Sequence, residues 1–382
     1  MAETTKIEWT HHTFNPWRSC EHARLPDGSE HPGCANCYAE AMSRRNPKVL
    51  GVWGPQGTRV VAAESQWKAV ERWNREAGEK ANAMAVIMEA LGERKAISPR
   101  PRVFVASLAD VFEDWDGPMS NAKGETLYRD PTFEQAREIT RKLMRGEDPE
   151  ESDLTPLTMA DVRARLFRLI DSCRHIDFLL VTKRPENVRK FWPRYGLPDK
   201  EVLRPLGRFE YRKNVWLLTS VSDQQTADAM IPELLKCRDL VPVLGISAEP
   251  LLGAIDLHSA FCREYGDCPK CPACLGTLDW VIVGGESGPG ARPCRVEWIR
   301  SIVDQCRRAE VPVFVKQLGA FPYGCMSDQP RKFNHGSERL PHGTMPENES
   351  RLIVSDPKGG DPLEWPEDLR VRQFPEVKRA YR

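Results

Sequence analysis

The sequence predicts an α/β fold, namely a partial or full (β/α) TIM-like barrel with a cysteine-rich insertion and an irregular C-terminal tail. Short apolar runs rich in β-branched residues alternate with amphipathic stretches through the middle of the 382-residue chain. This alternation is typical of parallel strands covered by helices. Polar residues follow each run, as they do at the mouth of a barrel. A doubly wound open sheet is the alternative, since it is built from the same alternation.

The apolar runs and the helical periodicity set the expected elements. Strands are expected over residues 102–107, 178–182, 215–220, 241–246, 280–283 and 311–315, with Ile7 to Thr10 as a possible first strand. Helices are expected over 131–145, 159–173, 224–237 and 295–309. We assign residues 1–319 to the barrel, with the cysteine-rich insertion at 258–278. Residues 320–382 are polar and rich in Pro and Gly, and we expect them to pack on the barrel as an irregular extension.

Composition limits the kinds of partner. The chain has 55 basic and 55 acidic residues, so a nucleic-acid surface would have to be a local patch. The polar start and the lack of an uninterrupted apolar stretch of membrane-spanning length predict a soluble cytoplasmic protein with no membrane contact. Twelve cysteines in that compartment favour metal or redox use over disulfides.

The first cysteine group is the most informative feature of the chain. Cys20 stands alone, and Cys34 and Cys37 form a C-x-x-C pair that is followed at once by Tyr38. Three thiolates can hold three irons of a [4Fe-4S] cluster and leave the fourth iron open, or they can form most of a zinc site. For zinc, the fourth ligand would be His22 or His31, which lie in the same segment.

A second cysteine group lies in the insertion. It contains Cys262, Cys268, Cys271 and Cys274, with two C-x-x-C steps. Four thiolates close a tetrahedron around zinc, and the spacing also suits a second iron-sulfur cluster.

Polar residues at the predicted strand ends are the candidates for cofactor binding. Lys183 and Lys316 suit a carboxylate or phosphate group. Gly284 and Gly285 would let a cofactor or substrate approach the backbone closely, or would form a phosphate-binding nest before the next helix. A hydrolase that uses Asp110, Glu249 and Glu286 with a divalent metal is a further possibility. The full set is Ser107, Asp110, Lys183, Ser220, Glu249, Gly284, Gly285, Glu286 and Lys316.

A basic stretch suggests nucleic acid. Residues 183–213 contain ten basic and four acidic residues, interleaved with aromatic residues. Such a pattern suits a phosphate backbone and stacked bases, DNA being favoured. Arg44, Arg45 and Lys48 form a second basic run beside the first cysteine group. The structural alternative is a solvated helix face with its aromatic residues in the core.

Several motifs together resemble a known family. These are NPW at 15–17, PGCANCYAE at 32–40, SLADVF at 107–112, LLVTKRPENV at 179–188, AEPLLG at 248–253, VIVGGESGPGARP at 281–293, VFVKQLG at 313–319 and EWPEDLRV at 364–371. The chain resembles the phage-encoded three-cysteine-motif family, a domain of unknown function. More distantly, it resembles radical S-adenosylmethionine enzymes such as spore photoproduct lyase.

The resemblance implies a [4Fe-4S] cluster on Cys20, Cys34 and Cys37, S-adenosylmethionine as cofactor, and a reductant such as flavodoxin or ferredoxin. Tyr38 would shield the cluster or contact the adenine. Separately, the position of Cys294 after the glycine-rich loop suggests it as a donor of a hydrogen atom to a product radical. Two departures from the radical enzymes are the thirteen residues between the first two cysteines, where three are usual, and Asn36 in place of an aromatic residue.

The functional hypothesis is therefore a radical enzyme that generates a 5′-deoxyadenosyl radical. It would act on a nucleobase in DNA or RNA, by photoproduct lyase-type repair or by base modification. The alternative is a zinc-containing nucleic-acid-binding or accessory protein without radical activity.

Overall fold

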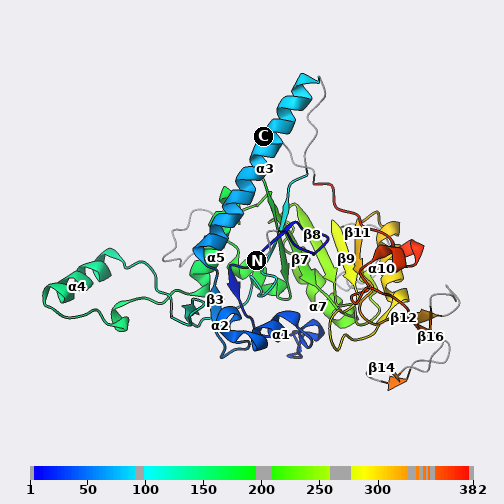
Figure 1. The fold of residues 1–382 in the computed structure, drawn as a ribbon, viewed down its shortest axis with the longest axis horizontal. Coiled ribbons are helices and arrows are strands. Elements are labelled where there is room, and N and C mark those ends of the chain that lie inside the picture. Colours follow the sequence, from blue (N-terminus) through cyan, green and yellow to red (C-terminus); the bar gives the residue numbers. More distant parts are fainter. Residues whose placement is uncertain are drawn as a thin grey trace.

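The computed structural model describes residues 4–91, 99–194, 209–258, 277–325, 333–334, 339–340, 343–344 and 349–377. At its centre is a parallel sheet of seven strands in chain order, curved as a half-barrel and surrounded by helices (Figure 1). Because the strand order never reverses, the sheet is not doubly wound. The strands are β1 (His12–Phe14), β4 (Arg102–Val105), β6 (Asp177–Thr182), β7 (Val215–Ser220), β8 (Val243–Ala248), β9 (Trp280–Gly284) and β11 (Val313–Gln317).

Six predicted strands are confirmed to within a few residues, whereas the first was predicted wrongly. Residues 7–10 form a turn in which the Thr10 amide donates to the Ile7 carbonyl at 3.1 Å. The strand begins later, at His12, which pairs with Val103 of β4. Ile7 and Trp9 alternate with polar residues as in a strand, but here Trp9 is buried from within a turn.

The four predicted helices are confirmed as α4 (Phe133–Met144), α5 (Met159–Ser172), α7 (Gln224–Leu235) and α10 (Val296–Arg308). Thr158 and Asp223 cap α5 and α7 by accepting a backbone N–H of the first turn. Shorter elements are α1 (Tyr38–Arg45), α2 (Pro47–Leu50), α6 (Val188–Phe191), β2 (Trp17–Arg18), β3 (Arg59–Val61) and β5 (Met119–Ser120).

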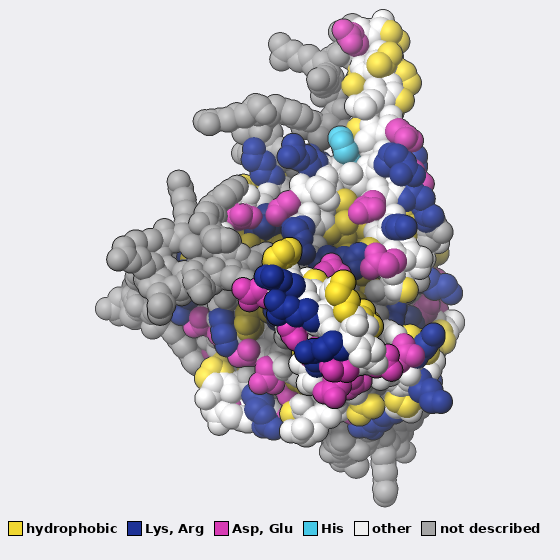
Figure 2. Space-filling model, turned by 90° about the vertical axis from the view of Figure 1, so that its left-hand side faces the viewer, with side chains coloured by type: hydrophobic (Ala, Val, Ile, Leu, Met, Phe, Trp, Pro, Cys, Tyr) yellow, Lys and Arg dark blue, Asp and Glu magenta, His cyan; other side chains and the backbone are white. Residues whose placement is uncertain are grey.

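The longest helix, α3 (Glu64–Ala90), was not anticipated. Its first turns pack Trp67, Val70 and Trp73 into the core. Its far end projects from the body (Figure 1). There Met84 and Ile87 are exposed, and the space-filling view shows apolar side chains along this projection (Figure 2).

Successive side chains of each strand point to opposite faces of the sheet, and the two faces pack into two separate cores. On the outer face, Leu180, Leu217 and Val283 join the core formed with the helices. The inner face has a smaller core that is rich in aromatic side chains. It contains Trp9, Leu179, Trp216, Leu218, Val243, Trp280, Ile282 and Phe314.

The C-terminal segment is more regular than predicted. β12 (Pro322–Cys325), β13 (Phe333–Asn334) and β16 (Glu349–Leu352) form a four-stranded sheet with β10 (Cys294–Arg295), and β14 (Arg339–Leu340) pairs with β15 (Gly343–Thr344).

Residues 371–373 run along the outer edge of β11. The Val315 amide donates to the Val371 carbonyl and the Gln373 amide to the Val313 carbonyl, both at 2.9 Å. Phe374 then packs 5.4 Å from Trp280, ring centre to ring centre. The tail thus covers one edge strand and fills part of the inner core.

In the described ranges, none of the helices has both the length and the apolar character that a membrane crossing requires.

Candidate functional site at the carboxyl edge of the half-barrel

The loop between β1 and α1 carries the first cysteine group and is attached to the end of β4. The Tyr38 hydroxyl donates to the Ser107 carbonyl. At the start of the loop, the Asn15 side chain donates to the Ser107 hydroxyl at 3.1 Å and accepts the Leu108 amide at 2.8 Å. Both ends of the cysteine loop are therefore held at the same strand end.

His31 attaches the middle of the loop to the end of β7. Its Nδ1 accepts the Gly33 amide at 3.0 Å, and its Nε2 donates to the Ser220 carbonyl at 3.2 Å, a tautomer assigned from these partners. Burial, and next the charge of Lys183, lower the pKa of His31 to about 3. The imidazole is therefore a neutral structural link at physiological pH.

The loop after β9 holds the second half of the cysteine loop. Asn36 donates to the Glu286 carboxylate and to the Gly290 carbonyl, both at 3.1 Å. Arg292 forms a bidentate pair with Glu286 and donates to the Pro32 carbonyl at 2.9 Å. Glu286, predicted to bind a cofactor, therefore holds the segment between Cys34 and Cys37 in this structure.

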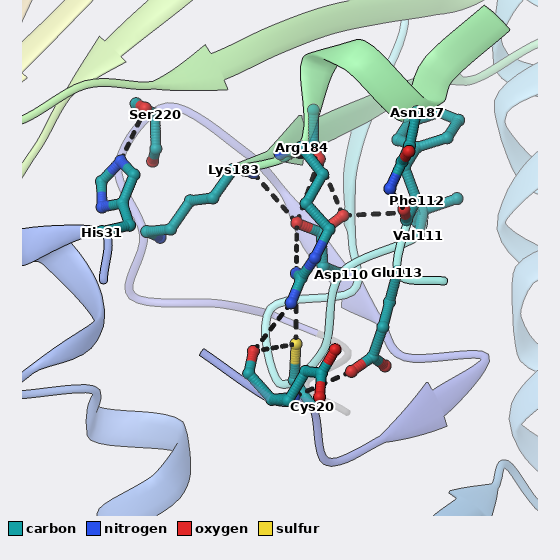
Figure 3. A network of polar contacts seen from close by, with 12 residues as sticks. Cys20, His31, Asp110, Val111, Phe112, Glu113, Lys183, Arg184, Asn187 and Ser220 are labelled. Carbon is teal, nitrogen blue, oxygen red and sulfur yellow. Dashed lines mark hydrogen bonds and ion pairs between the residues drawn. The ribbon is translucent and has the colours of Figure 1, made fainter. Parts of the chain in front are cut away.

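Arg184 connects Cys20 to the end of β6 (Figure 3). Its NH1 lies 3.6 Å from the Cys20 sulfur and 3.2 Å from Asp110, and its NH2 donates to the Glu21 carbonyl at 2.9 Å. Burial opposes the guanidinium charge, but Cys20 and Asp110 raise the pKa of Arg184 overall. Asp110 also accepts Thr182 Oγ1 and the Lys183 amide, which fixes the network to the strand.

A buried ion pair lies directly behind this network. Arg59 and Glu113 are both fully buried and form bonds of 2.8 and 3.0 Å. Glu113 also accepts the Glu21 amide at 2.8 Å. The backbone of Glu21, the residue after Cys20, is thereby linked through Glu113 to Arg59 of β3.

Two residues of this edge have left-handed backbone conformations that are unfavourable for residues with a Cβ. Ser19, just before Cys20, has φ 79°, and Ala106, just before Ser107, has φ 60°. Each costs roughly 1–2 kcal/mol. Strain of this kind clusters at functional sites. Its position beside Cys20 marks this edge as the candidate site.

The three thiols differ in environment. Cys20 and Cys34 are buried, and Cys37 is partly exposed. Burial raises the pKa of Cys20, with Glu113 as the second cause, and burial also raises that of Cys34. In the ranges that the structure describes, no three His, Cys, Asp or Glu side chains are arranged to hold one metal ion. Three thiols are the donor type of an iron-sulfur cluster, but in this structure the Cys20 thiol donates to the Glu21 carbonyl and accepts Arg184 NH1, so the three are not gathered around one centre.

Neither histidine suggested as a zinc ligand has a free ring nitrogen. His22 lies between Glu30 at 2.9 Å and Glu40 at 2.8 Å. His31 uses both nitrogens as described above. Cys262, Cys268, Cys271 and Cys274 lie outside the described residues.

Several predicted cofactor-binding residues contact one another. Glu249 pairs with Lys316 and accepts Gln317 at 3.2 Å. A Cβ at Gly285 would lie 2.2 Å from the Leu318 carbonyl oxygen, and one at Gly284 would lie 3.0 Å from the Gln317 carbonyl oxygen. These glycines therefore let another segment of the protein's own backbone approach closely, whereas a ligand was expected at this place.

Lys183 and Cys294 have contrasting surroundings. Within the described residues, the Lys183 ammonium forms no ion pair with a carboxylate. Its charge contributes to the lowered pKa of His31 and opposes the rise that burial causes in the pKa of Cys34. Cys294 is 1% exposed and belongs to the main core. Burial raises the pKa of its thiol.

The basic stretch is largely ion-paired where it is described, which is 183–194 and 209–213. Arg189 pairs with Asp239, Lys190 with Asp114, and Arg212 with Asp171. Trp192 is 2% exposed. These contacts favour the structural interpretation for these residues. Figure 2 likewise shows basic and acidic side chains interspersed on the visible face.

A cavity of about 520 Å³ borders the cysteine loop beside Arg184. Its charged lining is mostly acidic, so it does not favour a phosphate group. The acidic residues are Glu21, Glu30, Glu40, Asp114 and Glu186.

Sequence reasoning missed Asn15, Asn36, Glu113 and Arg292 as residues that hold the cysteine loop. Their partners are far away in the chain, as in the contact between Asn36 and Glu286. The position of Asn36 between two cysteines was the only available signal.

Fold and site together define a mixed α/β protein whose cysteine-bearing loop crosses the carboxyl edge of a parallel half-barrel. The chain belongs to the family described as protein of unknown function DUF5131, whose model matches residues 4–117 and 151–344. The interval between the matched segments contains α4, which lies in a lobe apart from the barrel (Figure 1). Comparison with curated proteins and with solved structures gave no match.

Proposed function

We propose that the protein is a radical S-adenosylmethionine enzyme in which Cys20, Cys34 and Cys37 hold a [4Fe-4S] cluster. The observation that carries the proposal is the placement of the cysteine loop. It follows the first strand and is bound to the ends of β4, β6 and β7 and to the loop after β9. Parallel barrels present their reactive groups at this edge.

The contacts of His22 and His31 favour an iron cluster over zinc. A structural zinc site needs a fourth ligand, whereas three thiolates leave one iron of a [4Fe-4S] cluster open. Both histidines of the loop already use both ring nitrogens. When bound, the cluster and its cofactor supply a 5′-deoxyadenosyl radical upon reduction.

The chain's own residues contribute shielding and charge. Cys20 and Cys34 are 6% and 7% exposed, so the loop itself excludes water around these ligands. Lys183 follows β6 and is close enough to Cys34 and His31 to lower their pKa values. Its ammonium is suited to hold a carboxylate or phosphate of the cofactor.

For the substrate we propose a nucleobase in DNA or RNA, with a protein such as flavodoxin or ferredoxin as electron donor. The support comes from the sequence pattern and from the exposed Arg45 and Lys48 on α1 and α2, directly after the cysteine loop; their neighbour Arg44 is paired with Glu40 at 2.7 Å. Within the described part of the 183–213 stretch, Arg189, Lys190 and Arg212 are ion-paired, which leaves α1 and α2 as the better candidate surface among the described residues.

The first experiment is anaerobic reconstitution with iron and sulfide. The wild type should bind about four irons and absorb visible light. Cys20→Ala, Cys34→Ala and Cys37→Ala should each lose about four irons and the corresponding absorption. Cys306→Ala is the control, because Cys306 is buried, as Cys20 and Cys34 are, but lies in α10. Zinc without visible absorption in the wild type would refute the proposal.

The second experiment tests the substrate class through the salt dependence of DNA binding. Arg45→Ala and Lys48→Ala should each reduce the slope of log affinity against log salt by about one. Arg141→Ala on the separate helix α4 is the control and should leave the slope unchanged. Binding that is equal in all variants would remove α1 and α2 as the nucleic-acid surface.

A further inference from the structure

We propose that the projecting end of α3 pairs with the same segment of a second copy of this chain, so that the protein forms an antiparallel dimer. The segment comprises residues 79–91, and we call it the α3 tip. Figure 1 shows it at the far end of the molecule from α1 and α2, so this surface is separate from the cysteine loop.

The α3 tip is apolar but uncovered. Nine of the eleven residues from Ala81 to Leu91 are apolar. Gly78 is the last buried residue of α3, and none of residues 79–91, all of which the structure describes, is buried. Apolar side chains gather along this projection (Figure 2). Helices that are apolar on all sides are normally buried in protein or lipid, so we expect a partner to cover this segment. The large exposed side chains, each 43–67% exposed, are Met84, Val86, Ile87 and Leu91.

The apolar stripe of the α3 tip continues the stripe by which α3 packs on the body. Val70 and Ala77 are seven residues apart, and both are buried in the main core. Met84 and Leu91 continue the same spacing on the tip, with Ile87 between them, and all three are exposed. Apolar residues at alternating steps of three and four form the seam through which helices pair in a coiled coil. The tip thus presents a helix-pairing seam to solvent.

The charges of the α3 tip favour an identical segment as the partner. Glu89 is the one charged residue between Ala81 and Leu91, and at about 100° per residue it lies on the side of the helix away from Ile87. The positions beside the seam, 81, 83, 88 and 90, hold alanine or methionine. Charged residues at such positions would select a charged partner. Without them, two identical tips meet with no like-charge repulsion, whereas a charged partner would lose the hydration of its charges without gaining an ion pair.

A lipid surface fits the α3 tip less well. Helices that lie on lipid surfaces typically carry Lys or Arg on their polar face. Residues 81–91 contain neither. The stretch is also shorter than the about 20 residues that a membrane-spanning helix needs.

An antiparallel arrangement with its two-fold axis near Ile87 uses the exposed seam fully. It brings the Ile87 side chains of both copies together. It also keeps the two bodies at opposite ends of the paired helices, because the tip projects from the body (Figure 1). A seam formed by Met84, Ile87 and Leu91 is short, below the about 1,200 Å² of total area that stable interfaces bury. The dimer is therefore weak and depends on protein concentration.

The test is sedimentation velocity of the full chain from micromolar to millimolar concentration, with a thiol reductant present to prevent disulfide dimers. The average mass of the wild type should rise toward that of a dimer. Ile87→Glu and Ile87→Lys each place two like charges at the axis and should stay monomeric. Val86→Glu is the matched control, because Val86 is the neighbouring residue and more exposed, at 67% against 52%, but lies away from the seam. It should associate as the wild type does.

A mixture of Ile87→Glu and Ile87→Lys distinguishes a second copy from any other partner. The opposite charges meet only if two tips pair antiparallel about Ile87, so the mixture should associate more than either variant alone. A mixture that remains monomeric would overturn the inference. The substituted side chains are exposed, so we expect all variants to fold, and circular dichroism checks this.

A wild type that remains monomeric at every concentration would also overturn the inference. An equal loss of association in Ile87→Glu and Val86→Glu would do the same, because it would indicate contact between apolar surfaces without a defined seam. Vesicles of phosphatidylcholine and phosphatidylglycerol test the lipid alternative. Flotation of monomeric wild type with these vesicles, lost in Ile87→Glu, would assign the tip to a lipid surface instead. Iron content does not enter these measurements, so their outcome leaves the proposed function untouched.

Discussion

The buried pair of Arg59 and Glu113 supports a quantitative prediction about stability. Both side chains are 0% exposed, and the carboxylate accepts two bonds from Arg59 and one from the Glu21 amide. Glu113→Gln keeps the size of the side chain but removes its charge. Arg59 is then left as an uncompensated buried cation.

The magnitude follows from the distance and the burial. At 2.8 Å and an effective dielectric constant of about 20, the attraction is roughly 6 kcal/mol. Desolvation offsets part of this attraction, and removing one partner of such a pair typically costs about 3–5 kcal/mol. We expect about 3 kcal/mol for Glu113→Gln, because the amide oxygen still accepts one bond from Arg59.

The assay is equilibrium unfolding in urea, followed by circular dichroism and tryptophan fluorescence. Glu64→Gln is the control, since Glu64 forms a bidentate pair with Arg165 at 2.6 Å, even shorter than the inner pair, but is exposed. Exposed pairs contribute less than about 1 kcal/mol. Equal losses in the two variants would refute the argument that burial makes the inner pair critical.

Three further outcomes are expected. The pKa of His31 is about 3 when folded and 6.5 otherwise, so the unfolded chain takes up the proton first as pH falls. Wild type should therefore lose about 2 kcal/mol relative to His31→Gln between pH 7 and pH 5, and parallel stability curves would contradict this. Gly285→Ala places a Cβ 2.2 Å from the Leu318 carbonyl oxygen and should cost more than about 3 kcal/mol in urea unfolding. Gly288→Ala, with φ +99° but open space, should cost about 1 kcal/mol, and similar values for the two would exclude the steric clash. Asn36→Asp puts a second carboxylate beside Glu286 and should weaken iron retention, whereas retention equal to wild type would show that this contact does not hold the loop.

Much of the barrel could be predicted from local sequence. Runs such as 178–182 and 280–283 are apolar throughout because both faces of the sheet are covered, by helices on the outside and by aromatic side chains inside. Residues 7–10 misled the prediction because a buried Trp9 in a turn has the same apolar signal as a strand. The polar tail strands were missed because backbone pairing leaves little trace in composition.

The candidate site could be predicted only as a set of separate residues. The sequence placed polar groups at strand ends, but it gave no indication that Glu249 binds Lys316 or that Glu286 binds Arg292 and Asn36. In those contacts, the charged side chains that were expected to bind a cofactor pair with one another. The network of Arg184, Asp110 and Cys20 was missed for the same reason.

The parallel α/β architecture and the group of three cysteines could thus be read from the chain alone, because hydrophobic periodicity and cysteine spacing are local properties. The fold decided which polar side chains pair with one another, as Glu249 does with Lys316 and Glu286 with Arg292. Ion pairing and burial depend on groups that are distant in the chain, which a local pattern does not encode: Arg184 and Cys20 are 164 positions apart in the sequence and 3.6 Å apart in the fold.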